Sequence, residues 1–428
     1  MHIIDIIVKK RNKLALSKEE IFFVVNGYTN KEIPDYQMSS LLMAIFLNGM
    51  NDEETFYLTE AMLESGDKLS YPKELGVIVD KHSTGGIGDK TTLIIAPIVA
   101  SLGLKMAKMS GKGLGFTGGT IDKLQSIDNF KVSLTDEEFN KNLKDVGAVL
   151  IYQKGNLTPA DKMMYALRDV TGTVESIPLI ASSIMSKKLA AGTDVIVLDV
   201  KVGTGAFMKN ISDAKKLAEL MVKIGKHFNR KVVALLTNMD APLGNNIGNK
   251  LEVQEALSIL NGEEENDLSK LSIELASYIV SLAKNIEIDE ARELVKEVIR
   301  NKKAFLKLKE IITHQGGIYE SILTNDVKDK VDVLSVSDGY IKNIDAEKIG
   351  RASLLLGSGR ETLDDKIDYE VGIVLNKHKG EYVRKGEPLL TMYVNKEYSS
   401  DIISLILKAY TFSADTVKKD DLILGVIK

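Results

Sequence analysis

The sequence predicts a protein of three parts: a small all-helical lobe, a larger α/β lobe with a mostly parallel central sheet, and a C-terminal α+β module. Residues 1–65 show helical spacing of apolar side chains, whereas from Gly76 short apolar runs alternate with glycine-rich loops and helical spacers. After residue 330 the pattern changes to strands separated by turns. At 428 residues the chain also exceeds the size of a single ordinary core, which favours several domains.

In the helical lobe, Ser17 and Glu20 stand three apart ahead of an apolar-periodic run, as in a capping box. Asp35 is expected to cap a second helix over residues 36–49. Residues 38–47 of that helix (MSSLLMAIFL) are apolar on nearly every face. We therefore expect this helix to be buried between neighbours or at a subunit interface.

The α/β lobe is expected to cover residues 66–161 and 193–330, because residues 162–192 are helical again and are expected to return to the first lobe. Five candidate strands with helical spacers favour a parallel sheet covered by helices: 77–83, 104–110, 148–152, 194–200 and 231–237. In such sheets ligands bind at the carboxyl ends of the strands.

The C-terminal module is expected to span residues 331–428. Gly372, Gly380 and Gly386 are spaced through its β-rich sequence as in biotinyl or lipoyl carrier folds. A carrier needs a lysine at an exposed hairpin tip, and no flanking motif marks one. The sequence therefore favours a structural role for this module.

Bulk composition excludes several classes of protein. The net charge of −4 gives no general electrostatic reason to bind nucleic acid or membranes. No apolar run approaches the ~20 residues that span a bilayer, and the basic residues of the N-terminus follow its apolar ones, the reverse of a signal peptide. The chain has no cysteine, which excludes disulfides, thiolate metal sites and cysteine nucleophiles. We expect a cytoplasmic protein.

Two glycine-rich loops predict an anion site. Residues 110–125 read SGKGLGFTGGTIDKLQ, and residues 81–88 read KHSTGGIG, each beginning at the carboxyl end of a candidate strand. Glycines let backbone N–H groups approach a ligand closely, and the hydroxyls and lysines add donors for an anion. Two such loops about thirty residues apart indicate a phosphate site.

Neither common nucleotide motif accounts for these loops. Residues 113–118 satisfy G-x-G-x-x-G, and a dinucleotide fold then places an acidic ribose ligand at the end of a strand about twenty residues later. Here the acids at that distance, residues 136–138, follow Thr135 in a capping box and so open a helix. The Walker pattern fails because Asp89 separates Gly88 from Lys90.

Several long motifs in one order resemble the thymidine and pyrimidine-nucleoside phosphorylase family across nearly the whole chain. They cover residues 81–90, 110–125, 156–161, 165–171, 176–189, 199–209 and 242–255. The resemblance implies that inorganic phosphate attacks C1′ of a pyrimidine nucleoside, with inversion, to release the base and a sugar 1-phosphate. It also implies that no cofactor is required, that the binding partners are inorganic phosphate and a pyrimidine nucleoside, and that the chain forms a homodimer through the helical lobe.

The resemblance also implies the site residues. The matching phosphate-binding positions are Lys81, Ser83, Thr92, Lys108, Ser110 and Thr120. The base-binding positions are Arg168, Ser183, Lys187 and Tyr165, of which Arg168 and Lys187 are also expected to be catalytic. Ser183 and Lys187 are four apart and share one helix face. His82 is expected to protonate the leaving base at O2, because its near-neutral pKa suits that step. Taken alone, any one Ser or Thr is more often a helix cap or turn residue.

Some family members hold a monovalent cation through carbonyls and one carboxylate. The matching positions are Gly88, Leu243, Asn246 and Glu255, which would hold a structural potassium ion. Nothing local to the sequence requires this ion.

The chain departs from the family at four positions. Lys112, Phe116 and Gln125 stand where the family usually has Arg, His and Glu, and Asp128 stands where it has Pro. Our hypothesis is that closure of the cleft relies here on apolar contact, between Phe116 and Phe207, more than on a polar latch.

Four other functions remain open at this point. One is a thymidine phosphorylase strict for 2′-deoxynucleosides, and another is a non-catalytic nucleoside- or phosphate-binding protein on the same scaffold. A phosphoribosyltransferase would need acidic ligands for Mg²⁺-diphosphate, and Asp122 is the only acid in the glycine-rich run. A dinucleotide oxidoreductase fits least.

Overall fold

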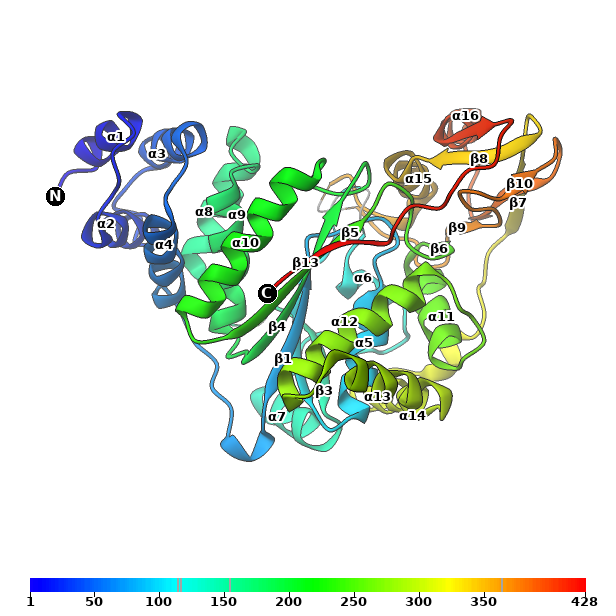
Figure 1. Cartoon of the computed structure of the whole chain (residues 1–428), viewed down its shortest axis with the longest axis horizontal. Coiled ribbons are helices and arrows are strands. Elements are labelled where there is room, and N and C mark those ends of the chain that lie inside the picture. Colours follow the sequence, from blue (N-terminus) through cyan, green and yellow to red (C-terminus); the bar gives the residue numbers. More distant parts are fainter. Residues whose placement is uncertain (114, 116–117, 154, 363–364) are drawn as a thin grey trace.

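The computed structural model describes residues 1–113, 115, 118–153, 155–362 and 365–428. Figure 1 shows three parts in a row: a helical lobe that contains the N-terminus, a central sheet covered by helices, and a smaller module at the opposite end. The predicted fold class is confirmed.

The helices and strands are as follows. The helices are α1 (Ile3–Arg11), α2 (Lys18–Thr29), α3 (Asp35–Asn48), α4 (Asp52–Glu64), α5 (Thr91–Ser101), α6 (Thr120–Gln125), α7 (Asp136–Asp145), α8 (Pro159–Thr171), α9 (Ile177–Ala190), α10 (Ile211–His227), α11 (Asn249–Leu260), α12 (Asp267–Lys284), α13 (Ile288–Arg300), α14 (Lys303–His314), α15 (Ala346–Ser353) and α16 (Ser400–Ala409). The strands are β1 (Ile78–Ser83), β2 (Lys105–Ser110), β3 (Ala148–Tyr152), β4 (Val195–Val202), β5 (Lys231–Asn238), β6 (Asn246–Ile247), β7 (Asp329–Leu334), β8 (Gly339–Ile344), β9 (Gly372–Leu375), β10 (Tyr382–Val383), β11 (Pro388–Val394), β12 (Tyr410–Ser413) and β13 (Ile423–Ile427).

Helix α2 begins as predicted, whereas α3 begins differently. Ser17 accepts a hydrogen bond from the backbone of Glu20, whose carboxylate accepts one from the Ser17 backbone, which confirms the capping box. Asp35 is the first residue of α3 rather than its cap, because Pro34 precedes it as the N-cap residue. The Asp35 carboxylate instead accepts a hydrogen bond from the hydroxyl of Tyr28 at 3.0 Å.

Helices α8 and α9 connect the helical lobe to the sheet. Ala160 and Met164 of α8 and Leu179 of α9 belong to the apolar core of the lobe. Further along α9, Ile184 and Met185 belong to the core that covers one face of the central sheet. One helix therefore contacts both parts of the molecule.

The central sheet has the strand order β13-β5-β4-β1-β2-β3 in the described part of the chain. All neighbours among β1–β5 pair in parallel, which confirms the five predicted strands. Residues 421–428 (DLILGVIK) lie within the range predicted for the C-terminal module, but their strand β13 pairs antiparallel with β5 in the central sheet. The last strand thus pairs with an edge that would otherwise expose unpaired backbone groups.

Helices cover both faces of this sheet (Figure 1). Apolar side chains of α5 and α11–α14 form the core on one face, and those of α9 and α10 form it on the other. Within the part of the chain that the structure describes, no helix has the length and apolar character needed to cross a membrane.

The C-terminal module has its own core between α15, α16 and two sheets. The strand orders are β10-β8-β12 and β6-β9-β11-β7. Strand β6 comes from the α/β lobe, and its Asn246 and Ile247 pair with β9. The module is therefore attached to the lobe by backbone hydrogen bonds as well as by the chain.

Candidate functional site

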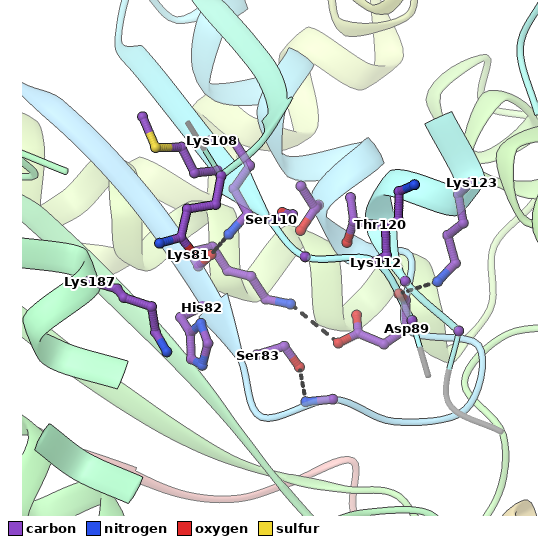
Figure 2. Close-up of a pocket in the computed structure, with 18 of the residues that line it drawn as sticks. Lys81, His82, Ser83, Asp89, Lys108, Ser110, Lys112, Thr120, Lys123 and Lys187 are labelled. Atoms are coloured by element: carbon purple, nitrogen blue, oxygen red, sulfur yellow. Dashed lines mark hydrogen bonds and ion pairs between the residues drawn. The ribbon is translucent and has the colours of Figure 1, made fainter. Parts of the chain in front are cut away.

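A cavity of about 410 Å³ lies at the carboxyl ends of β1 and β2. Among the described residues, six lysines and one aspartate contribute to its lining: Lys81, Lys108, Lys112, Lys123, Lys187, Lys188 and Asp89. Figure 2 shows His82 and Lys187 on one side of this space and Thr120 and Lys123 on the other. The excess of positive charge and the two glycine-rich loops that line the space suit a small anion.

Lys81 is held at the floor of the cavity by two carboxylates. Its ammonium donates to the hydroxyl of Thr91 at 2.5 Å and lies 3.3 Å from the carboxylate of Asp199 and 3.5 Å from that of Asp89. Asp199 also pairs with Lys201 at 2.8 Å within β4, which is buried along its whole length. Burial would raise the pKa of Asp89, but the charges of Lys81 and Lys201 hold that pKa well below its usual value.

A second buried carboxylate, Asp80, holds two more lysines of the cavity. Lys108 lies 3.1 Å and Lys188 2.6 Å from its oxygens, and Lys108 also donates to the carbonyl of Lys81. Burial lowers the pKa of Lys108 to about 7, although Asp80 opposes this shift. Burial would raise the pKa of Asp80, but the charges of Lys108 and Lys188 lower it. Lys108 is therefore poised to gain a proton when an anion enters.

The surroundings of His82 favour its neutral form. Burial, followed by the charges of Lys188, Lys108, Lys187 and Lys81, lowers its pKa well below the ordinary value. An anion bound among these lysines offsets their charge and so favours the protonated imidazole. Proton donation by His82 would then depend on a bound anion.

The glycine-rich loop is held by a residue from the C-terminal module. Arg360 donates to one oxygen of Asp122 at 2.7 Å, while the backbone of Gly113 donates to the other at 2.6 Å. The Gly115 backbone in turn donates to the carbonyl of Arg360 at 2.9 Å. A Cβ at Gly119 would lie 2.1 Å from the nitrogen of Gly113, so the loop closes on itself only because both residues are glycine.

Beside the cavity, α8 and α9 carry a second polar cluster. The ammonium of Lys187 donates to the carboxylate of Asp161 at 2.7 Å and to the hydroxyl of Ser183 at 3.0 Å. The ring of Tyr165 lies 5.9 Å from that ammonium and 5.8 Å from the guanidinium carbon of Arg168. The four predicted base-binding residues are thus brought together, and Lys187 connects them to the cavity.

Arg168 is 1% exposed and braces the turn between α8 and α9. It donates to the carbonyls of Thr173 at 3.2 Å, Val174 at 2.6 Å and Leu179 at 3.2 Å. Like Ser183 and Tyr165, it is outside the cavity lining in this structure. A guanidinium has five N–H groups, so two of them remain after these three bonds.

All six predicted phosphate-binding residues line the cavity, as does His82. Sequence reasoning missed the supporting groups: Asp80, Lys123, Lys188, Asp199, Lys201 and Arg360. The sequence offered a signal for two of these groups, Asp199 and Lys201. They are oppositely charged residues, two positions apart, inside an otherwise apolar strand. Among the positions where this chain departs from the family, Lys112 lines the cavity. Phe116 lies outside the described residues, so its proposed contact with the half-exposed Phe207 stays a hypothesis.

The four residues expected to hold a potassium ion also lie close together, but a lysine is among them. A Cβ on Gly88 would lie 2.5 Å from the carbonyl of Leu243, which shows how closely the two loops approach. The ammonium of Lys90 donates to the carboxylate of Glu255 at 2.5 Å and to the carbonyl of Asn246 at 2.7 Å.

Family models match all three parts of the chain. The helical bundle domain of a glycosyl transferase family matches residues 4–66, and the α/β domain of that family matches residues 75–305. The C-terminal domain of pyrimidine nucleoside phosphorylases matches residues 340–413.

Curated relatives match the chain over almost its full length. Three of these relatives are proteins named pyrimidine-nucleoside phosphorylase. The protein of Staphylococcus epidermidis is 53% identical to this chain over 94% of each sequence, that of Bacillus subtilis 51% over 97% of each, and that of Geobacillus stearothermophilus 49% over 100% of each. Among solved structures, anthranilate phosphoribosyltransferase from Thermus thermophilus has a TM-score of 0.59 at 18% identity, covering 73% of this chain and 99% of its own. That similarity is one of fold.

Binding of an anion should be accompanied by proton uptake. The pKa of Lys108 is lowered to about 7, and that of His82 lies well below its ordinary value. A bound dianion raises both pKa values, so at a pH between the free and bound values the site gains protons. Sulfate does not itself titrate near neutrality. Its binding near pH 8 should therefore be accompanied by uptake of as much as about one proton by each protein site. Calorimetric titration in two buffers of different ionisation enthalpy measures this. Lys108→Met should reduce the uptake, and binding without proton uptake by the unaltered protein would contradict the electrostatics described.

Proposed function

The chain belongs to the pyrimidine-nucleoside phosphorylase family, and from that premise we propose that it uses inorganic phosphate to cleave pyrimidine nucleosides in the cytoplasm, in pyrimidine salvage. The products are the free base and a (2-deoxy-)α-D-ribose 1-phosphate. The observation that carries this proposal is the juxtaposition of a lysine-rich anion cavity with the polar cluster around Lys187.

In the proposed reaction, Lys81, Lys108 and the hydroxyls of Ser83, Ser110 and Thr120 bind phosphate, and Thr92 completes the wall of its site. A phosphate oxygen forms a bond to C1′ while the bond from C1′ to the base nitrogen breaks, and its electron pair stays on the departing base. The reaction needs positioning of two reactants and stabilisation of charge, with no covalent enzyme intermediate and no further cofactor.

The departing pyrimidine carries negative charge on its oxygens and ring nitrogen. Lys187, Arg168 and Ser183 supply donors to that ring, and Tyr165 offers an aromatic face beside them. His82, protonated once phosphate offsets the surrounding lysines, gives its proton to the base at O2. Phosphate binding therefore prepares the acid that the second half of the reaction uses.

One feature favours phosphorolysis over a phosphoribosyltransferase reaction, and a second favours catalysis over a binding role alone. Transfer from a diphosphate would need an acidic ligand for Mg²⁺ near the glycine-rich loop. Both oxygens of Asp122 are already engaged, one by Gly113 and one by Arg360. The intact set of phosphate- and base-binding residues likewise favours catalysis over a binding role alone.

Base release from thymidine, deoxyuridine and uridine, followed by absorbance, tests the proposal. We expect phosphate-dependent release from both deoxynucleosides and from uridine. Release from the deoxynucleosides alone would assign the stricter thymidine phosphorylase activity. No release from any of the three with phosphate in excess would refute phosphorolysis.

Loss of the Lys187 ammonium should slow turnover strongly. Lys187→Ala removes a donor to the charge that develops on the base, so kcat should fall by about 10²–10³-fold. Arg168→Ala should lose both turnover and stability, because it also removes three hydrogen bonds to carbonyls of the α8–α9 turn and of the first turn of α9. Lys377→Ala, in the C-terminal module beside Glu387, is the matched control and should leave kcat unchanged. Equal effects at Lys187 and Lys377 would remove Lys187 from the reaction.

We also propose that the protein is a homodimer through its helical lobe. Tyr36, Met43 and Leu47 lie on one face of α3, and Leu47 is 72% exposed. Leu47→Glu should therefore convert the dimer to a monomer in light scattering. Leu306→Glu, at a 61% exposed leucine of α14, should leave the mass unchanged. A monomeric unaltered protein would contradict the proposal.

A further inference from the structure

A buried ion pair occupies the place where the family resemblance locates a monovalent cation. The side chains of Lys90 and Glu255 are 0% and 1% exposed, and the Lys90 ammonium lies 2.5 Å from a Glu255 oxygen. The same ammonium donates to the carbonyl of Asn246 at 2.7 Å. A carbonyl and a carboxylate expected to bind the ion therefore bind this lysine.

The carboxylate of Glu255 has no acceptor position left for a metal. One oxygen accepts from Lys90 and from the backbone of Asn246 at 3.0 Å. The other accepts from the backbone of Asn245 at 2.7 Å and the side-chain amide of Asn266 at 2.8 Å. A carboxylate offers about four lone-pair positions, and these four donors fill them.

The charge at the site is also balanced by Lys90. An ammonium carries the same single positive charge as a potassium ion, and a second cation beside it in a buried site would be repelled. The neighbouring Glu264 accepts from the amides of Asn245 and Asn266, and burial followed by the charge of Glu255 raises its pKa. Removal of the Lys90 ammonium would leave the buried carboxylate of Glu255 without a cation to balance its charge.

We propose that the Lys90 ammonium replaces the monovalent cation. This protein would then hold the glycine-rich loop of residues 81–88 in place without a potassium ion. A free cation does not fit here among Gly88, Leu243, Asn246 and Glu255, because the Lys90 ammonium, which is covalently attached to the chain, takes its place. The proposal concerns stability and anion binding and does not rest on phosphorolysis.

Lys90 acts through the residues on either side of it. Asp89 and Thr91 are its chain neighbours, and both contact the ammonium of Lys81, at 3.5 Å and 2.5 Å. Fixing Lys90 against Glu255 therefore fixes the turn that positions Lys81 in the cavity. Lys90 is a positioning residue.

The experiment compares thermal unfolding of the full chain in potassium chloride and in choline chloride at equal ionic strength, about 0.1 M. Three proteins are measured: the unaltered protein, Lys90→Ser and Lys10→Ser. Lys90→Ser leaves a space and a hydroxyl oxygen beside Glu255. Lys10→Ser breaks a comparably buried pair in the helical lobe, where Lys10 lies 2.7 Å from Glu54 and the side chains are 4% and 3% exposed.

The unaltered protein should unfold at the same temperature in both salts, within about 1 °C. Both variants should be destabilised in choline. Only Lys90→Ser should recover with potassium or ammonium, by at least about 4 °C and in a saturable manner, and its affinity for sulfate should recover in parallel.

Saturable stabilisation of the unaltered protein by potassium would overturn the proposal, because it would show a free ion bound beside Lys90. Equal responses of Lys90→Ser and Lys10→Ser to potassium would overturn it as well. If Lys90→Ser fails to fold in every salt, the unaltered protein alone decides the question, since a built-in ammonium predicts no potassium dependence.

Discussion

The site depends on pairing its lysine ammonium groups with carboxylates buried beneath them. Asp80 holds Lys108 and Lys188, and Asp199 lies against Lys81 from the neighbouring strand. Without those carboxylates, several like charges near one small cavity would repel one another and lose protons. With them, the lysines stay close together and still respond to a further negative charge. The parallel arrangement of β1, β2 and β4 places these carboxylates and lysines together.

Local signals in the sequence were enough to predict the strands and most of the lining of the cavity. Glycine-rich loops directly after strands at residues 81–88 and 110–125 have few structural explanations, and the family resemblance assigned residues within them. Supporting residues were harder to find. Arg360 reaches Asp122 from 238 positions away, and Lys90 reaches Glu255 from 165, so no spacing rule connects either pair. The start of α3 was misplaced because Asp35 resembles a cap in sequence while Pro34 occupies that position.

Two of the three parts of the molecule contribute side chains to the proposed substrate site, and the third contributes support. Lys187 and its neighbours come from helices that join the helical lobe to the sheet. The C-terminal module contributes Arg360 to the glycine-rich loop and pairs its strand β9 with β6. This support is consistent with the structural role that its sequence favours. Lys90, just after the other glycine-rich loop (residues 81–88), forms an ion pair with Glu255 within the α/β lobe.

The position of β13 has a consequence for how the chain is made. The C-terminal module lies, in chain order, between β5 and the strand that pairs with β5. During synthesis the edge of β5 stays open until the C-terminal module has been made, because β13 (Ile423–Ile427) follows that module in the chain. An open edge strand is a template for pairing with other chains. Nascent chains therefore carry this hazard through the whole time taken to synthesise the module, and a chain truncated before β13 keeps the edge of β5 open permanently.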